Sequence, residues 1–282
     1  MKNILVTTDF SNDAYCALFY ISKLMASKSC TFYILNVYDE LTPLAGKKAP
    51  LFGGKKLLNQ LQIESNEKLT NVFHKIILDN DNTMHSFQTL SKKGVLSKVV
   101  IKTIEENAID LVVMGNKGNT GAKEIFMGSN TIQVANAITL CPILAVPKQI
   151  DYTTPKEIAF VTDFKKGCAK KIIEPLFFIA SLSNAAIRVM HINEEEILDA
   201  EQELKRKLLD NYLKEFTHSF HWMQNFTDKA QVIDNFLEKL HIDMFAMIHH
   251  KRSFFEKLVR EPVLKDVSIY ADIPLLILPY QD

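Results

Sequence analysis

The sequence predicts an α/β protein built from two tandem doubly wound domains, each a five-stranded parallel sheet flanked by helices. Three observations lead to this fold class. Short apolar segments alternate with helical patterns, which is typical of a parallel sheet covered on both faces. Three of these segments recur, in the same order, in the second half of the chain. The 282 residues are also enough for two ordinary domains.

The first half supplies five strand candidates separated by four helix candidates. The strands are expected at residues 3–8, 31–37, 84–89, 109–114 and 142–146. The helices are expected at residues 12–27, 57–79, 95–107 and 129–139. Each strand segment is short and mostly apolar, and each helix segment shows the longer helical period.

The second half follows the same plan. Its strands are expected near residues 157–162, 186–192, 219–224, 243–248 and 274–278. Pro142 and Pro274 open the last strand of each half, a position where the missing N–H is tolerated.

Three sequence echoes indicate a duplicated domain. Lys2–Phe10 and Lys156–Phe164 are both apolar strands that end in Thr-Asp-Phe. The other two pairs are residues 109–114 with 242–247, and residues 141–147 with 273–279. The period is too long for a solenoid. Prolines and polar residues interrupt the pattern between the copies, so we expect domains at residues 1–148 and 155–282.

The two domains are expected to pack as a pseudo-two-fold pair within one chain. Duplicated domains commonly retain an ancestral homodimer contact. The candidate contact is the pairing of strand 142–146 with strand 274–278, because apolar edge strands left unpaired invite aggregation. Whether two chains associate further into a homodimer stays open.

Composition and charge narrow the function classes. Hydrophobic residues make up 47% and the net charge is zero, which argues against a general nucleic-acid or membrane surface. The first 150 residues nevertheless carry 16 Lys against 12 acids, a net charge of +4. The four cysteines form no CxxC pair and no metal-ligand spacing. Without a signal-like or membrane-length apolar run, we expect a cytoplasmic protein.

Glycines at fixed spacing mark the candidate binding site. Gly115 and Gly118 follow an apolar strand, and Gly128 with Ser129 precedes a helical pattern. Backbone N–H groups and the helix dipole can hold a phosphate at such a strand–loop–helix junction. Glycine suits the junction because an anion can approach the main chain closely. A tight βα turn followed by an ordinary helix start would also place glycines here.

Asp9 follows the first strand and is expected at the same edge of the sheet. In doubly wound sheets, ligands bind beyond the carboxyl ends of the strands, where the strand order reverses. If the first and fourth strands are neighbours, Asp9 and Gly115 face one crevice. The Asp9 carboxylate would then accept a hydrogen bond from the adenine amino group. The simpler alternative, that Asp9 only caps a helix, is equally open.

These residues resemble the nucleotide-binding class of universal stress proteins. The resemblance rests on Thr7-Thr8-Asp9-Phe10-Ser11, on the later Gly-x2-Gly-x9-Gly-Ser pattern, and on the segment 141–147. It implies ATP, or AMP or ADP, as ligand, with or without Mg²⁺, an adenine contact at Asp9 and a hydrophobic adenine-side contact at Val37. The residues expected at the site are Thr7, Thr8, Asp9, Val37, Met114, Gly115, Asn116, Gly118, Gly128, Ser129, Asn130 and Thr131.

The second half lacks the glycine pattern. Eight of the nine glycines lie in the first 150 residues, and the matching loop carries Ile248 and Lys251 in place of glycines. Side chains there would block close approach to the backbone, and Glu261 would repel a phosphate. We therefore expect a single nucleotide site, in the first half. Asp163, the counterpart of Asp9, is interpreted as a relic or a helix cap.

The motif favours a stress-response or regulatory nucleotide binder over an enzyme. No lysine precedes Ser129 as in a Walker P-loop, and no second acid is placed to order a metal or water, so we assign no catalytic residue and no metal ligand. A slow ATPase or nucleotide transferase remains one alternative, and a protein-interaction module without nucleotide is another. Residues 41–56 form a long Pro/Gly/Lys segment that is either a lid over the nucleotide or a solvated loop.

Overall fold

The computed structural model describes residues 1–39, 55–116, 127–139, 141–147, 151–165, 169–192, 198–223, 235–249 and 273–280. The expected segment 41–56 lies almost wholly outside these ranges. So do Gly118, Lys251, Glu261 and Cys168.

The first half alternates strands and helices as the sequence predicts. Its strands are β1 (Lys2–Thr7), β2 (Cys30–Tyr38), β3 (His85–Lys93), β4 (Leu111–Gly115) and β5 (Ile143–Val146). Its helices are α1 (Asn12–Leu24), α2 (Lys55–Asp79), α3 (Leu96–Asn107) and α4 (Ser129–Ala137). The largest difference from expectation is β3, which runs four residues further because Leu90–Lys93 pair with Leu35–Tyr38 of β2.

The second half repeats the strand plan. Its strands are β6 (Glu157–Val161), β7 (Ala186–Ile192), β8 (His218–Met223), β9 (Met244–His249) and β10 (Leu275–Pro279). Helices α5 (Lys170–Ser183) and α6 (Ala200–Leu213) connect the first three of them. Asp199 caps α6 in a capping box with Gln202.

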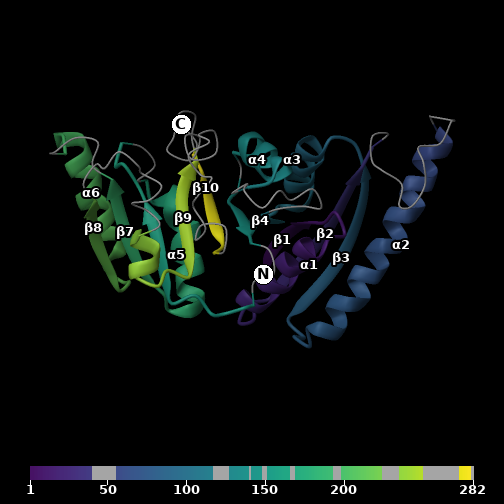
Figure 1. Ribbon diagram of the computed structural model, residues 1–282, viewed down its shortest axis with the longest axis horizontal. Coiled ribbons are helices and arrows are strands. Elements are labelled where there is room, and N and C mark those ends of the chain that lie inside the picture. The colour runs from purple at the N-terminus through teal and green to yellow at the C-terminus, as the bar shows by residue number, and fades with distance from the viewer. Residues whose placement is uncertain are drawn as a thin grey trace.

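The ten strands in the described ranges form one continuous sheet in the order β3-β2-β1-β4-β5-β10-β9-β6-β7-β8 (Figure 1). Within each half every pairing is parallel. The order of the second half mirrors that of the first, so the halves are related by a pseudo-two-fold axis.

The axis passes between β5 and β10, the one antiparallel pair among the pairings described. Leu144 lies opposite Leu276 at its centre, and both side chains are fully buried. The expected pairing of residues 142–146 with 274–278 is therefore confirmed.

Helices cover both faces of the sheet. One core cluster contains side chains of α1, α2, α5 and α6, together with one set of alternating strand residues. The other contains side chains of α3, α4 and the helical residues 235–239, with the opposite set of strand residues. This is the doubly wound arrangement expected from strands that are apolar on both sides. No described helix combines the length and apolarity needed to cross a membrane.

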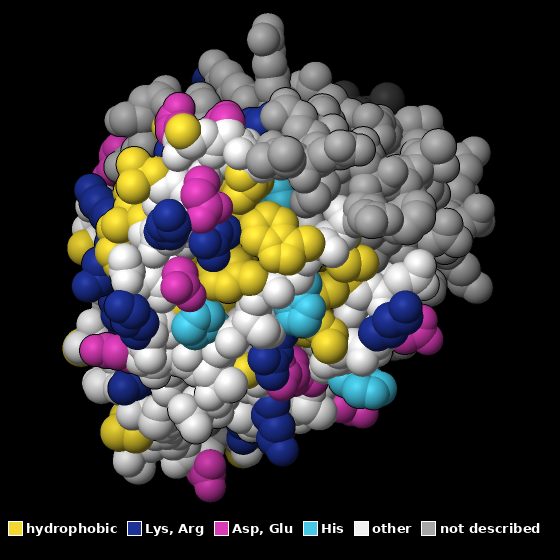
Figure 2. Space-filling view, turned by 90° about the vertical axis from the view of Figure 1, so that its left-hand side faces the viewer, with side chains coloured by type: hydrophobic (Ala, Val, Ile, Leu, Met, Phe, Trp, Pro, Cys, Tyr) yellow, Lys and Arg dark blue, Asp and Glu magenta, His cyan; other side chains and the backbone are white. Residues whose placement is uncertain are grey.

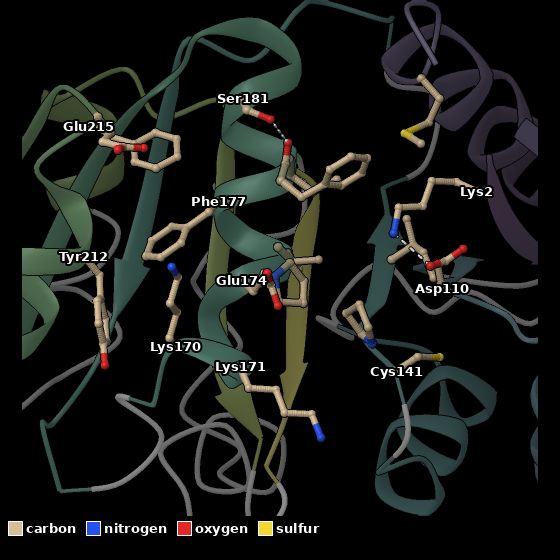
Figure 3. Close-up of a pocket in the computed structure, with 18 of the residues that line it drawn as sticks. Lys2, Asp110, Cys141, Lys170, Lys171, Glu174, Phe177, Ser181, Tyr212 and Glu215 are labelled. Carbon is tan, nitrogen blue, oxygen red and sulfur yellow. Dashed lines mark hydrogen bonds and ion pairs between the residues drawn. The ribbon is translucent and has the colours of Figure 1, made fainter. Parts of the chain in front are cut away.

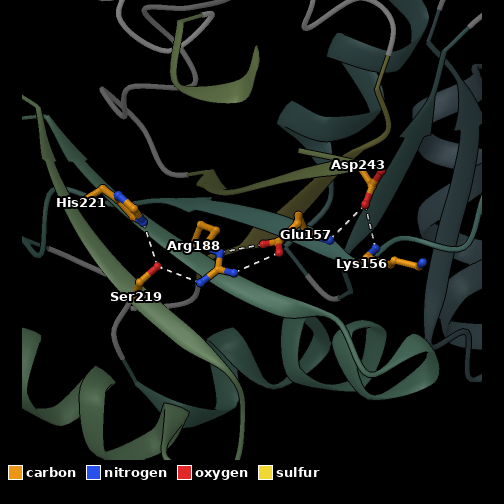
Figure 4. Close-up of polar contacts among 6 residues, drawn as sticks. All are labelled: Lys156, Glu157, Arg188, Ser219, His221 and Asp243. Carbon is orange, nitrogen blue, oxygen red and sulfur yellow. Dashed lines mark hydrogen bonds and ion pairs between the residues drawn. The ribbon is translucent and has the colours of Figure 1, made fainter. Parts of the chain in front are cut away.

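Duplicated contacts confirm the correspondence between the halves. The Asp110 carboxylate accepts the N–H of Asn3 at 2.8 Å, and the Asp243 carboxylate accepts the N–H of Glu157 at 3.0 Å and that of Lys156 at 2.7 Å (Figure 4). Each aspartate thus ties the fourth strand of its half to the start of the first.

Figure 4 also shows a polar network confined to the second half. Arg188 donates to both carboxylate oxygens of Glu157, at 2.6 and 2.9 Å, and to Ser219 at 3.0 Å. Ser219 Oγ lies 2.8 Å from His221 Nε2. The network joins β6, β7 and β8 side by side.

Candidate functional site

The Thr-Asp-Phe sequence forms the same turn at the end of the first strand in both halves. The Thr8 hydroxyl accepts the N–H of Phe10 at 3.0 Å, and the Thr162 hydroxyl accepts that of Phe164 at 3.1 Å. Both phenylalanines adopt the left-handed backbone conformation, with φ of 65° and 55°. This duplicated geometry accounts structurally for the repeated motif.

Asp9 is the middle residue of this turn in the first half, and it is exposed. Its Oδ1 accepts the N–H of Ser11 at 3.0 Å. Ser11, rather than Asp9, is the N-cap of α1, because its side chain accepts the N–H of Ala14. The interpretation of Asp9 as a helix cap is therefore wrong. Asp163 likewise accepts the N–H of Lys165, at 2.8 Å.

The glycine loop begins beside this turn. β1 and β4 are hydrogen-bonded neighbours, so Asp9 and Gly115 lie at the same edge of the sheet. Gly115 ends β4, after the buried Met114, and Asn116 follows with an exposed fraction of 2%. The N–H of Asn116 donates to the Val146 carbonyl at 2.6 Å.

The start of α4 is tied back to the end of β4. The N–H of Gly128 donates to the Asn116 carbonyl at 2.6 Å, and the Thr131 hydroxyl donates to the Gly115 carbonyl at 3.1 Å. The residues expected at both ends of the loop are thus adjacent in space. Ser129 and Asn130 occupy the first turn of α4 and are exposed.

The first turn of α4 has the properties of an anion site. Gly128 is its N-cap and provides no side-chain cap, and no acidic residue lies in the turn. The first N–H groups of a helix have no partner within the helix. Together with the helix dipole they favour a phosphate group at this position.

The remaining expected residues line the neighbouring strands. Thr7 is buried at the end of β1, and Thr8 follows it with its N–H donating to the Leu35 carbonyl at 2.8 Å. Val37 is half-buried within β2, which continues to Tyr38 rather than ending at Val37. All expected residues that the structure describes therefore belong to the carboxyl ends of β1, β2 and β4 or to the start of α4.

Sequence reasoning missed a buried group of polar side chains behind this edge. Asn36 donates to the Thr8 carbonyl at 2.7 Å, and its own side-chain oxygen accepts the Ser65 hydroxyl at 2.8 Å. Asn36 lies in β2, Thr8 directly follows β1 and Ser65 lies in α2, and the one sequence sign of this contact is a polar residue inside an apolar strand.

Aromatic and imidazole rings gather beside Phe164 at the corresponding edge of the second half. Phe164 lies 4.9 Å from His191 and 6.0 Å from Trp222, measured between ring centroids. Trp222 keeps an exposed fraction of 46%. Figure 2 shows hydrophobic and histidine side chains gathered on the face at the β8 end of the sheet. The two halves thus present different chemistry at equivalent places.

A cavity of about 1020 Å³ lies elsewhere, between the two halves (Figure 3). Lys2, Asp110 and Cys141 line it from the first half, and α5 lines it from the second. Lys2 opens β1, whereas Asp9 follows its other end, so the cavity is remote from the expected nucleotide site and shares no residue with it. Burial raises the pKa of the Cys141 thiol to about 12, which disfavours the thiolate form that reacts.

The described residues contain no group of three or more His, Cys, Asp or Glu side chains arranged to hold a metal ion. His218 and His221 both lie in β8. His218 contacts Asp210 and the Phe216 carbonyl, while His221 contacts Ser219.

Comparison with known proteins gives the family. The model of the universal stress protein family matches residues 1–147. The chain belongs to the universal stress protein family. As a family member it is similar to the universal stress protein MJ0577 of Methanocaldococcus jannaschii, with 28% identity over 162 residues that cover 52% of this chain and 96% of that protein.

Two solved structures of family members resemble the tandem arrangement. A universal stress protein from Archaeoglobus fulgidus aligns with a TM-score of 0.72 and 14% identity, over 99% of this chain and 97% of that one. A putative universal stress protein from Pseudomonas aeruginosa aligns with a TM-score of 0.56 and 14% identity, over 99% and 93%. At this identity the likeness shows the fold, including the second half that the family model does not match.

Proposed function

We propose that this universal stress protein binds one adenine nucleotide at the carboxyl edge of its first half. ATP is the first candidate ligand, with AMP and ADP as alternatives, and the protein acts as a stress-response or regulatory binder. The observation that carries the proposal is the start of α4. Its N-cap is Gly128, which has no side chain and donates its N–H to the carbonyl of Asn116, directly after Gly115 at the end of β4. The exposed Asp9 lies at the same edge of the sheet.

Each part of this edge has a chemical role in the proposal. The phosphates accept hydrogen bonds from the first N–H groups of α4, with Ser129 and Asn130 beside them. The Asp9 carboxylate accepts the adenine amino group, and Val37 contacts the base. Gly118 belongs to the same proposed loop.

Asn116 adds a further observation in favour of a ligand at this edge. Its buried Oδ1 has no hydrogen-bond partner in the described part of the chain. A buried acceptor without a partner is costly and calls for an explanation. A ligand that supplies a donor at this edge would satisfy it.

Paired substitutions at Asp9 and Asp163 test the site. Asp9→Asn keeps an oxygen that accepts from Ser11 but replaces the other oxygen by an amide, which cannot accept the adenine amino group. We expect ATP affinity, measured by titration calorimetry, to fall about tenfold, the loss of one hydrogen bond to a charged group. The matched variant Asp163→Asn should bind one ATP per chain as the wild type does.

Native mass spectrometry and a turnover assay separate the alternatives. One intact nucleotide per chain supports the binder, whereas multiple turnovers would indicate a slow ATPase or transferase. A folded protein without nucleotide would indicate an interaction module. Two equivalent sites, or equal losses in the two variants, would refute the single first-half site.

A further inference from the structure

A chain of three polar side chains runs behind the Thr8–Asp9 backbone in the first half. Asn36 Nδ2 donates to the Thr8 carbonyl at 2.7 Å, Ser65 Oγ donates to Asn36 Oδ1 at 2.8 Å, and Ser91 Oγ donates to Ser65 Oγ at 2.7 Å. Asn36 and Ser65 are buried, with exposed fractions of 8% and 3%. The polar chain therefore links β2, α2 and β3 to the end of β1.

The contact with Thr8 controls the backbone that carries Asp9. The Thr8 carbonyl belongs to the same planar peptide group as the Asp9 N–H, so holding the carbonyl sets where Asp9 begins. Thr8 makes two further hydrogen bonds. Its N–H donates to the Leu35 carbonyl, and its hydroxyl accepts the N–H of Phe10. Asp9 thus projects from a segment whose orientation is defined before any ligand arrives.

Polar groups in this position define one geometry in a way that apolar packing does not. Each buried amide or hydroxyl that loses its partner carries a desolvation penalty. These hydrogen bonds therefore favour the one arrangement in which every member of the polar chain has its partner. A shift of α2 or of β2 that lengthens these hydrogen bonds beyond their normal range would weaken the support of Thr8. The arrangement gives Asp9 a rigid support, as precise recognition of a ligand group requires.

The second half holds the equivalent backbone by different means. His191 occupies the position of Asn36, with its Nδ1 3.0 Å from the Thr162 carbonyl. Trp222 replaces Ser91 in register, and Gln202 of α6 donates to the Asp163 carbonyl at 2.9 Å. The amide–hydroxyl chain therefore occurs, among the described residues, in the half that also has the glycine-ended β4.

We propose that Asn36, Ser65 and Ser91 are positioning residues that aim Asp9 at the base of the nucleotide. The inference rests on the proposed function of the same site. It assigns base selectivity to residues that need not touch the ligand. It also predicts that phosphate binding at the start of α4 does not depend on the hydrogen bonds among Asn36, Ser65 and Ser91.

The test compares a complete nucleotide with its phosphate part alone. For Asn36→Leu we expect the ATP dissociation constant to rise about tenfold and the preference for ATP over GTP to shrink, while the affinity for inorganic tripolyphosphate stays unchanged. Asn36→His, which copies the second half and can donate a ring N–H, should restore most of the ATP affinity. Hydrogen exchange of residues 8–11 without ligand should be faster in Asn36→Leu than in the wild type.

Two further variants keep the test decisive. Ser65→Ala is a smaller change that leaves Asn36 Oδ1 unpaired, and we expect a loss of about threefold in ATP affinity with the fold retained. His191→Leu makes the matching change in the second half and should leave ATP binding unchanged.

The outcomes distinguish this inference from the function on which it rests. A wild-type protein that binds no ATP refutes both. A wild-type protein that binds ATP, with Asn36→Leu and Ser65→Ala keeping the same affinity and selectivity, refutes only the positioning role. An equal loss of ATP and tripolyphosphate affinity refutes it too, because the damage would then extend to the whole site.

Discussion

Gly115 lies against the backbone of Asp13, where the end of β4 meets the first turn of α1. A Cβ atom on Gly115 would come within 3.2 Å of the Asp13 carbonyl carbon and 3.3 Å of the Ala14 nitrogen. Ile248 occupies the equivalent place in the second half. There the helix α5 begins at Lys170, six residues after Phe164, whereas α1 begins two residues after Phe10. The glycine at the end of β4 thus has a packing reason of its own.

Gly115→Ala should therefore destabilise the fold. The added methyl group meets backbone atoms that move only with the whole first turn of α1, and overpacking of this kind costs about 1–3 kcal/mol. The free energy of unfolding from urea titration measures the loss. Unchanged stability would show that α1 moves freely and that the close approach has no energetic weight.

Gly128→Val should separate binding from stability. Gly128 has φ of −63° and ψ of 147°, an extended conformation that valine adopts without strain. The branched side chain would stand at the start of α4, in the place proposed for the phosphates. We expect ATP binding to be lost in calorimetry while the thermal unfolding midpoint stays near that of the wild type. Retained affinity would overturn the assignment of this turn.

Leu276→Ala should weaken the junction between the halves. Leu276 is fully buried opposite Leu144, and truncation of a buried leucine costs about 2–5 kcal/mol. Leu204→Ala is the matched control, because Leu204 is 67% exposed and its truncation should cost under about 0.5 kcal/mol. Equal effects of the two changes on urea unfolding would contradict the role of this pair.

His85 should make stability depend on pH. It packs edge-on against Phe32, its Nε2 lies 3.2 Å from the Met25 carbonyl, and its Nδ1 lies 3.0 Å from the Asn80 side-chain amide. These contacts assign a neutral ring whose Nε2–H donates to Met25 and whose Nδ1 accepts from Asn80. Burial, and then the charge of Lys23, lower the pKa of His85 below its usual value of 6.5.

A lowered pKa means that the unfolded chain binds the proton more readily than the folded one. The contribution of His85 to the free energy of unfolding is therefore complete above a pH of about 6.5, and it is lost as the pH falls through the lower pKa of the folded state. We expect the wild type to lose more unfolding free energy than His85→Gln between about pH 7.5 and pH 5.5. The pKa of His221 is lowered as well, but His221 is present in both proteins, so the difference isolates His85. Parallel pH profiles would exclude this effect.

Local sequence patterns were sufficient for the elements and for their duplication. The segment containing Ile109 and Asp110 recurs at Ile242 and Asp243, and both copies enter equivalent strands through the same contact to the first strand. Strand and helix patterns are readable because alternating burial and turn residues are local properties. Contacts that join distant segments, such as Asn36 to Ser65, leave no such trace.

The sequence by itself therefore determined two β/α units in tandem, a glycine-ended fourth strand in the first unit and the loss of that glycine in the second. Only the tertiary structure decided the register that places Leu144 opposite Leu276, the close approach of Gly115 to the first turn of α1, and the hydrogen bond from Asn36 to the Thr8 carbonyl. The physical reason is that periodicity and backbone preference are set by neighbouring residues, whereas register, close approach and buried hydrogen bonds depend on which distant segments meet.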